Sequence, residues 1–414
     1  MTDNDREDMI TNGRRKINWA MQHMPILAEL EKEFSGTKPL NGLRIAVSVH
    51  VEAKTARLAL LLSEAGADIY LTGCNPLSTQ DDVALALAQM GIIVNCKYNS
   101  SEIEYLRDLD ATLSCQPHIV IDDGGDLMER IIDTGDKYRG SLIGICEETT
   151  TGVLRLKIHE KQGILEYPAI AVNNAHCKYL FDNRYGTGQS VLTSIMATTN
   201  LLVAGKIFVV AGYGMCGKGV ALRAKALGAN VIVTEIDPIK ALEAMMDGYK
   251  VMKMDEAAYL GDFFVTVTGC KDVITARHYE RMKNCAVLAN AGHFDVEINV
   301  ADLVECSVDV LERRENIKGY IMKDGRCIDL IAEGRLVNLA AGNGHPIEIM
   351  DMSFALQALC ARYLAINGRN LHPGVYDVPD VIDIDVANIL INKLGLSIDE
   401  LTEEQRVYLD DWRA

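Results

Sequence analysis

Basic residues are scarce in this sequence relative to acidic ones. Its 414 residues include 41 Lys and Arg against 58 Asp and Glu, which gives a formal net charge of −17. Because nucleic acids and anionic membranes attract basic proteins, neither is expected as a partner. Long apolar runs are missing as well: none approaches the roughly 18 residues that a membrane span needs, and the N-terminal residues are too charged for a signal peptide. We therefore expect a cytoplasmic protein.

Closely spaced cysteines are also missing. None of the 11 cysteines lies within three positions of another, so the sequence has neither CxxC redox motifs nor zinc knuckles. Scattered free thiols are typical of a reducing cytosol, and no metal site is predicted. The length is sufficient for two or three domains with a substantial core.

What the sequence does contain is one glycine-rich motif in a complete βαβ context. A strand pattern, a glycine turn, a helix pattern and a second strand pattern follow one another over residues 206–234. The turn contains Gly212, Gly214 and Gly217, and the second strand ends at Glu235. Glycines let the backbone approach a pyrophosphate, the helix N-terminus offers free N–H groups, and the carboxylate accepts from a ribose 2′-OH. Since a carboxylate would repel a 2′-phosphate, the motif predicts NAD rather than NADP.

Strand and helix patterns alternate along most of the chain. The expected strands are residues 43–49, 67–72, 92–95, 118–122, 142–146 and 169–172, and then 206–211, 229–234, 263–267 and 286–289. This alternation predicts an α/β fold with two doubly wound, Rossmann-like parallel-sheet domains, a cleft between them and a small helical C-terminal tail. The expected units are a substrate-binding domain over residues 1–183, completed by about 346–377, an NAD-binding domain over 184–345 and an oligomerisation tail over 378–414.

Polar residues gather at the predicted carboxyl ends of these strands. They are His50 and Glu52, Asp122 and Asp123, Glu147, Glu148, Thr149, Thr150 and Thr151, Asn173 and Asn174, and Asn290 and His293. Ligands of open α/β sheets bind outside these ends. The sequence therefore predicts a polar cleft that faces a nicotinamide cofactor.

These residues lie in motifs that resemble the S-adenosylhomocysteine hydrolase family over most of the chain. The motifs are Ser-Thr-Gln-Asp at 78–81, Asp-Asp-Gly-Gly-Asp at 122–126, Glu-Glu-Thr-Thr-Thr-Gly at 147–152, Lys-x-x-Phe-Asp-Asn at 178–183, the glycine motif at 212–219, Thr-Glu-Ile-Asp-Pro at 234–238, Gly-His-Phe-Asp at 292–295, Ala-Glu-Gly-Arg-Leu-Val-Asn at 332–338 and Gly-His-Pro at 344–346. Together they are highly specific.

The resemblance implies a reversible thioether hydrolysis without net consumption of NAD. In this family bound NAD⁺ oxidises the ribose 3′-OH, which makes the C4′ proton acidic; homocysteine then leaves C5′, water adds, and the ketone is reduced again. Such chemistry needs a base for the 3′-OH, a base for the C4′ proton and an acid–base pair for the sulfur and the water. The resemblance also implies a homo-oligomer, either a dimer or a tetramer.

The functional positions of the family carry suitable residues here. The implied catalytic residues are Lys178, Asp182 and Asn183 at the 3′-OH, Asp123 at C4′, and His50 and His293 near O5′. The implied ribose and cleft residues are Glu148 and His345. The implied cofactor contacts are Gly212, Gly214, Gly217, Glu235, Thr149, Thr150, Thr151, Asn290 and Asn338. A lysine acts as a base only if burial or a nearby cation lowers its pKa.

Each of these residues also has a plainer interpretation. Lys178 and Asp182 have the spacing of a surface helix pair, and Asp122 or Asp123 could cap a helix or bind a hard cation. A lone histidine is more often a hydrogen-bonded structural residue. Glu147 and Glu148 could be acidic residues in the first turn of a helix, where the helix dipole favours a negative charge whether or not the residue has a function. The matching order of all the motifs favours the functional interpretation.

The stretch after the first strand departs from the family pattern. Most members have His-x-Thr-x-Glu, in which the Glu accepts from the adenine 6-amino group, whereas this chain has His50-Val-Glu52-Ala-Lys54. Lysine only donates and ionised glutamate only accepts, so Lys54 on a 6-oxo group and Glu52 on the adjacent ring N–H would suit hypoxanthine. We therefore expect S-inosyl-L-homocysteine, the substrate associated with archaeal members that carry this Lys. The alternative is a solvated Lys54 and the adenosyl substrate.

Two further departures concern Thr187 and the C-terminal tail. Thr187 stands where the family often has a cysteine, so redox sensitivity at that point would be lost. The family's basic, tyrosine-containing tail is not found in residues 411–414, so we expect weaker or more exchangeable NAD. Two rival functions share the two-domain plan. A net NAD-dependent dehydrogenase does not explain the Lys178 motif, and a non-catalytic NAD-binding regulator would lack some active-site residues.

Overall fold

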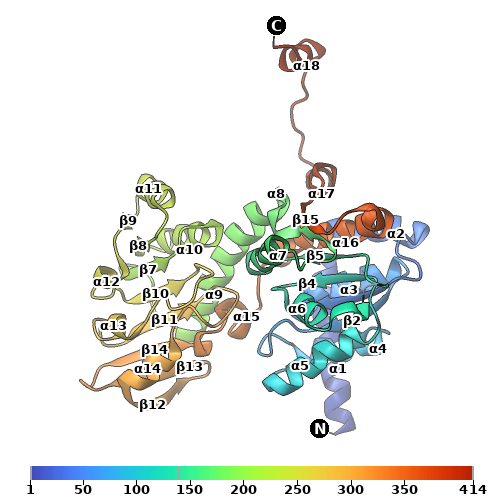
Figure 1. Cartoon of the computed structure of the whole chain (residues 1–414). Helices are drawn as coiled ribbons and strands as arrows, with labels where there is room; N and C mark the ends of the chain where they lie inside the picture. The colour runs from blue at the N-terminus through green and yellow to red at the C-terminus, as the bar shows by residue number, and fades with distance from the viewer. Residues whose placement is uncertain (1, 139, 413–414) are drawn as a thin grey trace.

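The computed structural model describes residues 2–138 and 140–412 as two α/β domains side by side, with a C-terminal helix held away from both (Figure 1). The strands of the first domain are β1 (Arg44–Ser48), β2 (Asp68–Thr72), β3 (Ile93–Val94), β4 (Ile119–Asp122), β5 (Gly144–Glu147), β6 (Pro168–Ala171) and β15 (Gly374–Asp377). They form one sheet in the order β15-β6-β5-β4-β1-β2-β3, and every neighbouring pair is parallel. The six strands expected here are confirmed, and β15 adds a seventh from the returning chain.

Helices cover both faces of this sheet, as a parallel sheet requires. The helices packed on one face are α1 (Asp3–Gln22), α2 (Pro25–Thr37), α3 (Ala53–Glu64), α4 (Asp81–Gln89) and α16 (Ile347–Asn367). Those on the other face are α5 (Glu102–Leu113), α6 (Asp126–Asp133) and α7 (Thr150–Gln162). Because both faces are buried, the strands read as apolar runs and their polar residues stand at the carboxyl ends.

The second domain is built on an eight-stranded sheet. Its strands are β7 (Ile207–Ala211), β8 (Asn230–Thr234), β9 (Lys250–Val251), β10 (Phe263–Thr266), β11 (Ala286–Asn290), β12 (Ser307–Arg314), β13 (Ile317–Met322) and β14 (Cys327–Ile331). The order is β12-β13-β14-β11-β10-β7-β8-β9. From β9 to β14 the strands are parallel and follow the 3-2-1-4-5-6 order of dinucleotide-binding folds. The antiparallel β12 and β13 extend this sheet, and these two strands, like β9 and β14, were not expected from the sequence.

Helices also cover both faces of the second sheet. On one face lie α9 (Thr187–Thr199), α10 (Met215–Ala226), α11 (Pro238–Met246) and α15 (Val337–Ala340). On the other lie α12 (Met254–Ala257), α13 (Ala276–Tyr279) and α14 (Val300–Cys306). The chain enters this domain through α8 (His176–Lys178) and a π-helical turn, Tyr179–Gly186. The predicted boundary at residue 183 falls inside that turn, so the chain passes between the domains within one helical segment.

The long helix α16 returns the chain to the first domain. The stretch Ile347–Asn370 is long and apolar enough to cross a membrane, but 72% of its window is buried inside the protein. It is therefore the core helix of the first domain, and its apolar length is explained by that packing.

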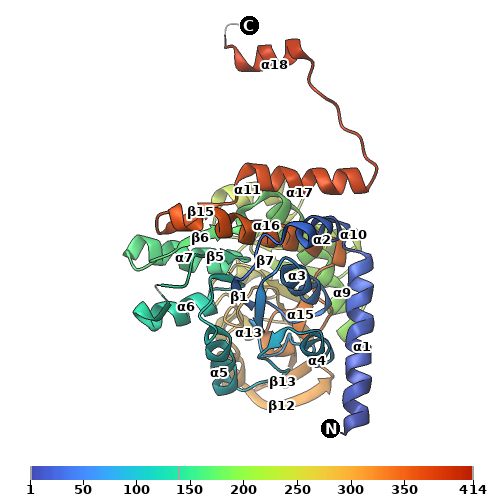
Figure 2. The ribbon, with the colours of Figure 1, turned by 90° about the vertical axis from the view of Figure 1, so that its right-hand side faces the viewer.

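The predicted C-terminal tail divides near residue 395. The helix α17 (Asp380–Lys393) belongs to the first domain, since Ile382 and Val386 lie in its core and Asp383 accepts from the backbone N–H groups of His176 and Cys177. Residues 395–412, which include α18 (Glu403–Asp410), are exposed throughout and lie apart from both domains in either view (Figure 2).

Candidate active site

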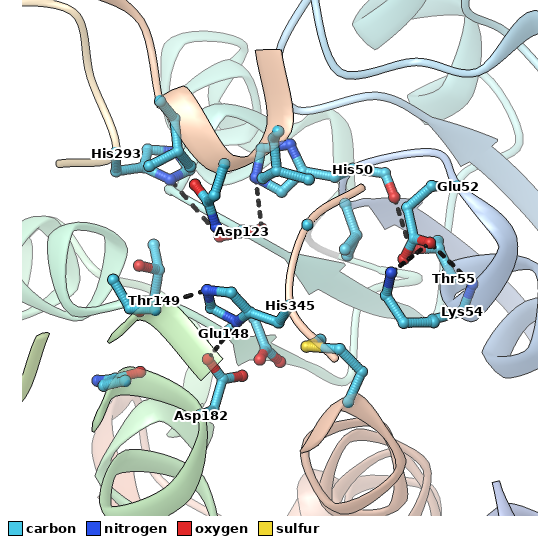
Figure 3. A pocket seen from close by; sticks show the side chains of 18 of the residues that line it. His50, Glu52, Lys54, Thr55, Asp123, Glu148, Thr149, Asp182, His293 and His345 are labelled. Carbon is cyan, nitrogen blue, oxygen red and sulfur yellow. Dashed lines mark hydrogen bonds and ion pairs between the residues drawn. The ribbon is translucent and has the colours of Figure 1, made fainter. Parts of the chain in front are cut away.

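A cavity lies between the two domains, at the carboxyl ends of the strands in the first sheet (Figure 3). The strands β1, β4 and β5 lead to His50, Asp123 and Glu148, while His293 follows β11 of the second domain. The predicted residues that line it are His50, Glu52, Lys54, Asp123, Glu148, Thr149, Thr150, Lys178, Asp182, Asn183, His293, Asn338 and His345. The fold thus brings together all side chains predicted for catalysis and for substrate binding.

A larger cleft of about 1020 Å³ opens beside the glycine turn of the second domain. The predicted cofactor residues that line it are Thr149, Thr150, Thr151, Gly212, Gly214 and Glu235. Thr149, Asn183 and His293 line both spaces, so the cleft and the cavity adjoin. A dinucleotide in the cleft would therefore bring its reactive end to the cavity.

Each of the three glycines of the turn suits a dinucleotide site for a different reason. Gly212 has a φ of +104°, a backbone conformation that favours glycine. A Cβ on Gly217 would lie 2.0 Å from the carbonyl oxygen of Gly212, so α10 packs on the turn only because residue 217 is glycine. A Cβ on Gly214 would meet nothing within 4 Å, which leaves open space beside the N-terminus of α10. This space suits a pyrophosphate.

Glu235 holds its carboxylate beside the turn through hydrogen bonds with the backbone. Its oxygens accept from the N–H groups of Tyr213 at 2.7 Å, Ile236 at 2.7 Å and Asp237 at 3.1 Å. Each carboxylate oxygen can accept more than one hydrogen bond. Glu235 therefore keeps acceptor capacity for a ribose hydroxyl.

Asn290 is not among the residues that line either space, and its direct contact with the cofactor stays a prediction. It is fully buried, and its amide nitrogen donates to the carbonyl oxygens of Gly292 at 3.1 Å and Phe294 at 2.9 Å. Asn290 thus shapes the loop that carries His293. Gly217 likewise acts through packing and does not line the cleft.

Lys178 lies at the centre of a buried polar cluster. Its Nζ is 3.0 Å from Asp182 Oδ2 and 3.4 Å from Glu148 Oε1, and it donates to Asn183 Oδ1 at 3.0 Å. Lys178 and Asp182 are 5% and 1% exposed. A surface helix pair is therefore excluded, and the tighter cluster follows from the π-helical turn, a form that often occurs at functional sites.

The charges in this cluster set the protonation of Lys178. Burial lowers the pKa of Lys178, but the carboxylates of Asp182 and Glu148 outweigh burial and raise this pKa above its usual value. Burial raises the pKa of Asp182, but Lys178 and His345 outweigh it and lower that pKa. Burial raises the pKa of Glu148 to about 8, against the charge of Lys178. Lys178 is thus protonated here, contrary to the lowered pKa that a lysine base needs, and a further positive charge must act on it before it accepts a proton.

Two polar residues of α16 complete the cluster, although the sequence patterns above do not single them out. Ser353 Oγ donates to Asp182 Oδ2 at 2.7 Å, and Gln357 Nε2 donates to Glu148 Oε2 at 2.6 Å. Both side chains are fully buried. A Ser and a Gln four residues apart on a largely apolar helix are the signal that could have found them.

One buried acceptor of the cavity, Asn338 Oδ1, has neither a hydrogen-bond nor an ion-pair partner within the described residues. Glu148 Oε1 and Asp182 Oδ1 also lack hydrogen bonds, but they lie 3.4 Å from Lys178 Nζ and 2.8 Å from His345 Nδ1. An unpaired buried acceptor costs about 1–3 kcal/mol. Asn338 Oδ1 therefore fits a hydroxyl or amide donor of a bound ligand.

Asp123 lies between two histidines, as Figure 3 shows. Its Oδ2 is 3.5 Å from His50 Nε2, and its Oδ1 is 3.8 Å from His293 Nδ1. The other ring nitrogen of His50 is 2.7 Å from Ser78 Oγ. Burial lowers the pKa of His50 to about 4, against the charge of Asp123. The imidazole of His50 is therefore neutral at pH 7 and can accept a proton.

Glu52 and Lys54 form a buried ion pair in the same cavity. Lys54 Nζ is 2.8 Å from Glu52 Oε2 and donates to the carbonyl oxygen of Asn343 at 2.9 Å. Glu52 also caps α3, because its Oε2 accepts from the backbone N–H of Lys54 at 3.1 Å. Each residue is 5% exposed. A solvated Lys54 is therefore excluded.

Asp122 and Glu147 stand behind the cavity and have the plainer role. Asp122 accepts from the N–H groups of Asp123 at 3.1 Å and Met128 at 3.0 Å, and Glu147 accepts from those of Gly124 and Thr149, both at 2.9 Å. Burial raises the pKa of both carboxyl groups, that of Asp122 to about 8. These two side chains hold the loops that present their neighbours to the cavity.

Comparison with known proteins matches both domains to models of one family. Residues 183–344 match the model of the S-adenosyl-L-homocysteine hydrolase, NAD binding domain, and residues 7–143 match that of S-adenosyl-L-homocysteine hydrolase. The S-inosyl-L-homocysteine hydrolase of Methanocaldococcus jannaschii is 53% identical, over 97% of this chain and 96% of its own length. The protein of the same name from Methanosarcina acetivorans is 53% identical over 99% of both chains. The adenosylhomocysteinase of Thermotoga maritima is 53% identical, over 98% of this chain and 100% of its own. The chain therefore belongs to the S-adenosyl-L-homocysteine hydrolase family of NAD-dependent enzymes.

Proposed function

We propose that this protein hydrolyses S-inosyl-L-homocysteine reversibly to inosine and L-homocysteine. The observation that carries the proposal is the buried pair of Glu52 and Lys54, which lines the cavity with one cationic donor and one anionic acceptor side by side. The names of two archaeal relatives support the same substrate. NAD is the resident cofactor that the second domain would hold.

The hydrogen-bonding pattern of the pair favours hypoxanthine over adenine. An ammonium group has three donors, and Lys54 uses two of them on Glu52 and Asn343. The third would donate to the 6-oxo group, while Glu52 accepts from the adjacent ring N–H. Adenine would place its 6-amino donors against Lys54 and leave Glu52 facing a ring acceptor. Unpaired polar groups in a buried site reject a wrong ligand by orders of magnitude.

The cluster around Lys178 would act on the ribose. Bound NAD⁺ would supply the oxidation of the 3′ carbon, and its positive charge would oppose the protonated form of Lys178. Lys178 would then accept the 3′-OH proton while Asp182 and Asn183 keep Nζ in place. Glu148 Oε1, whose one contact within the described residues is Lys178 Nζ at 3.4 Å, would accept from the neighbouring ribose hydroxyl.

The opposite group of residues would act at C4′ and C5′. Asp123 would remove the C4′ proton, and His50 and His293 would exchange protons with the leaving sulfur and the entering water. One carbon–sulfur bond breaks, one carbon–oxygen bond forms, and one water is consumed. His50 is neutral at pH 7, because burial lowers its pKa to about 4, so its imidazole has a free acceptor for this proton, and a negative charge that develops beside it would strengthen it as a base.

A second candidate is hydrolysis of S-adenosyl-L-homocysteine. The 53% identity with the adenosylhomocysteinase of Thermotoga maritima favours it. A net dehydrogenase and a non-catalytic regulator are weaker candidates. The cluster around Lys178 and the group of Asp123, His50 and His293 are both complete in the cavity, and neither candidate needs both.

Paired kinetics test the proposal. The purified protein is supplied with NAD⁺ and either nucleoside thioether, and the release of homocysteine thiol is followed. We expect a much higher kcat/KM for the inosyl substrate, with no accumulation of NADH. A preference for the adenosyl substrate would support the second candidate, accumulation of NADH would support the dehydrogenase, and no thiol from either would support the regulator.

We also propose that the chain works as a cytoplasmic homo-oligomer, either a dimer or a tetramer. Residues 395–412 support this, because their exposed apolar side chains include Leu396, Ile398, Leu401, Tyr408 and Leu409. A segment of this composition gains stability by packing on another surface. A second copy of the chain is the partner that the family resemblance favours.

A further inference from the structure

Cys74 has no part in the proposed reaction, yet it lies among residues that do. It follows β2 in the sequence, as His50 follows β1 and Asp123 follows β4. These strands are neighbours in the order β4-β1-β2, so the three residues meet at one edge of the sheet. The sequence alone does not suggest this, because the residues are more than 20 positions apart.

The side chains of these three residues lie close enough to offer ligands to one ion. Cys74 Sγ lies 3.3 Å from His50 Nδ1 and 3.7 Å from Asp123 Oδ2, while the other ring nitrogen of His50, Nε2, lies 3.5 Å from the same oxygen. One ligand atom of each residue lies within 4.8 Å of the other two. Around tetrahedral Zn²⁺, bonds of about 2.0–2.3 Å place the ligand atoms roughly 3.3–3.8 Å apart, so the pair of ligand atoms that lies farthest apart would move together when the ion binds.

We propose that Cys74, His50 and Asp123 form a binding site for a thiophilic divalent cation of the Zn²⁺ class. Thiolate sulfur, imidazole nitrogen and carboxylate oxygen are all ligands of Zn²⁺, whereas Mg²⁺ and Ca²⁺ prefer oxygen alone. The neutral thiol of Cys74 loses its proton to solvent when its sulfur binds the ion. Three protein ligands leave a fourth position for water.

Binding of the cation would inhibit the enzyme, and this step rests on the proposed function. The ion would occupy the lone pairs of His50 and Asp123, which the proposed hydrolysis uses for proton transfer. Both residues line the substrate cavity. Zn²⁺ and the nucleoside substrate therefore compete for the same space.

The site is tested first by spectroscopy, without any measurement of activity. Co²⁺ is titrated into the NAD-loaded protein, because a cobalt–thiolate bond gives a charge-transfer band in the near ultraviolet and a tetrahedral site gives strong visible bands. We expect both sets of bands in the wild type and the loss of the ultraviolet band in Cys74→Ser. We also expect Zn²⁺ to displace Co²⁺, and Cys74→Ser to weaken Zn²⁺ binding by about 100-fold or more, since even outer-sphere partners contribute about 10–100-fold.

Matched thiol variants show which sulfur binds. Cys216 lines the cavity beside Thr187 and does not belong to the cluster, and Cys270 is exposed, so Cys216→Ser and Cys270→Ser should keep the ultraviolet band. A wild-type protein without this band, or a band that persists in Cys74→Ser, would overturn the site. In that case Cys74 is only a hydrogen-bond donor to Asp123.

Inhibition is measured separately on the substrate that turns over. Zn²⁺ should raise KM in the wild type by at least about tenfold at concentrations that saturate the cobalt site, and it should have much less effect in Cys74→Ser. Equal inhibition of both proteins would overturn the competitive part of the proposal. If neither substrate turns over, the proposed function fails while the cobalt spectrum still decides the site.

Discussion

At the scale of single residues, Lys54 is the side chain on which the choice of substrate depends. Its Nζ is held by Glu52 and by the carbonyl oxygen of Asn343, so its position does not depend on the ligand. Replacement by methionine, Lys54→Met, keeps most of the volume and removes the donor. We expect kcat/KM for S-inosyl-L-homocysteine to fall about 10–100-fold, since a hydrogen bond to a charged group contributes about 1.5–3 kcal/mol. The value for the adenosyl substrate should not fall; an equal loss for both substrates would show that Lys54 has only a structural role.

Lys178 is the residue whose loss should stop turnover. In Lys178→Ala no group remains that can take the 3′-OH proton, so thiol release should fall by about 10²–10⁴-fold, the usual contribution of a general base. NAD binding, measured by calorimetry, should be retained because the cleft lies mainly in the second domain. As a control, Lys97→Ala removes an exposed ion-pair lysine and should leave the rate unchanged. Wild-type rates in Lys178→Ala would exclude Lys178 as the base.

The protonation of Glu148 predicts a pH dependence of substrate binding. Burial raises its pKa to about 8, and Lys178, Asp182 and Asp123 are the charged groups that act on it. Below this pKa the carboxyl is mostly neutral, and above it the carboxylate accepts more strongly from a ribose hydroxyl. KM for the nucleoside should therefore fall as the pH rises from about 7 to about 9. In Glu148→Gln this part of the dependence should disappear, and an identical pH profile in the variant would assign it to another group.

At the scale of elements, the glycine turn and α10 offer a matched pair of alanine substitutions. In Gly217→Ala the new Cβ would lie 2.0 Å from the carbonyl oxygen of Gly212. We expect a loss of about 1–3 kcal/mol in the free energy of unfolding without NAD, as in other overpacked sites. In Gly214→Ala the Cβ has free space, so the stability without NAD should hold while NAD binding weakens. Thermal unfolding and calorimetry separate the two effects, and equal stability of both variants would contradict the packing role of Gly217.

Most elements could be predicted from the sequence, and the exceptions have physical causes. Parallel strands buried on both faces read as apolar runs, so β1, β4 and β7 were within reach of pattern analysis. The hairpin of β12 and β13 was not, because β12 is exposed along most of its length and lacks an apolar run. The π-helical turn that shapes the Lys178 cluster also has no sequence pattern of its own, since it depends on packing between the domains.

At the scale of the whole molecule, the exposed C-terminal segment predicts the assembly. Residues 395–412 pack on neither domain, whereas α17 is part of the first domain through Ile382 and Val386. A chain that ends at residue 394 should therefore fold and bind NAD, yet form smaller assemblies than the full chain. Light scattering after size-exclusion chromatography measures this difference. An unchanged molar mass per particle, after correction for the deleted residues, would place the contacts elsewhere.

The site as a whole was predictable only in part. The residues at strand ends could be assigned, because parallel strands present their carboxyl ends to the same edge. The charge balance around Lys178 could not, since it depends on Glu148 from another strand and on Ser353 and Gln357 of the returning helix. The same holds for Cys74, whose contacts with His50 and Asp123 arise from three separate strands.

The central claim is that Glu52 and Lys54 select the base of the substrate. The most direct test is the ratio of kcat/KM for the inosyl and adenosyl substrates, measured in the wild type and in the double variant Glu52→Thr with Lys54→Glu, which restores the common family pattern. We predict a ratio well above one in the wild type and well below one in the double variant. A ratio that is the same in both proteins would contradict the claim, because the base would then be selected by other groups.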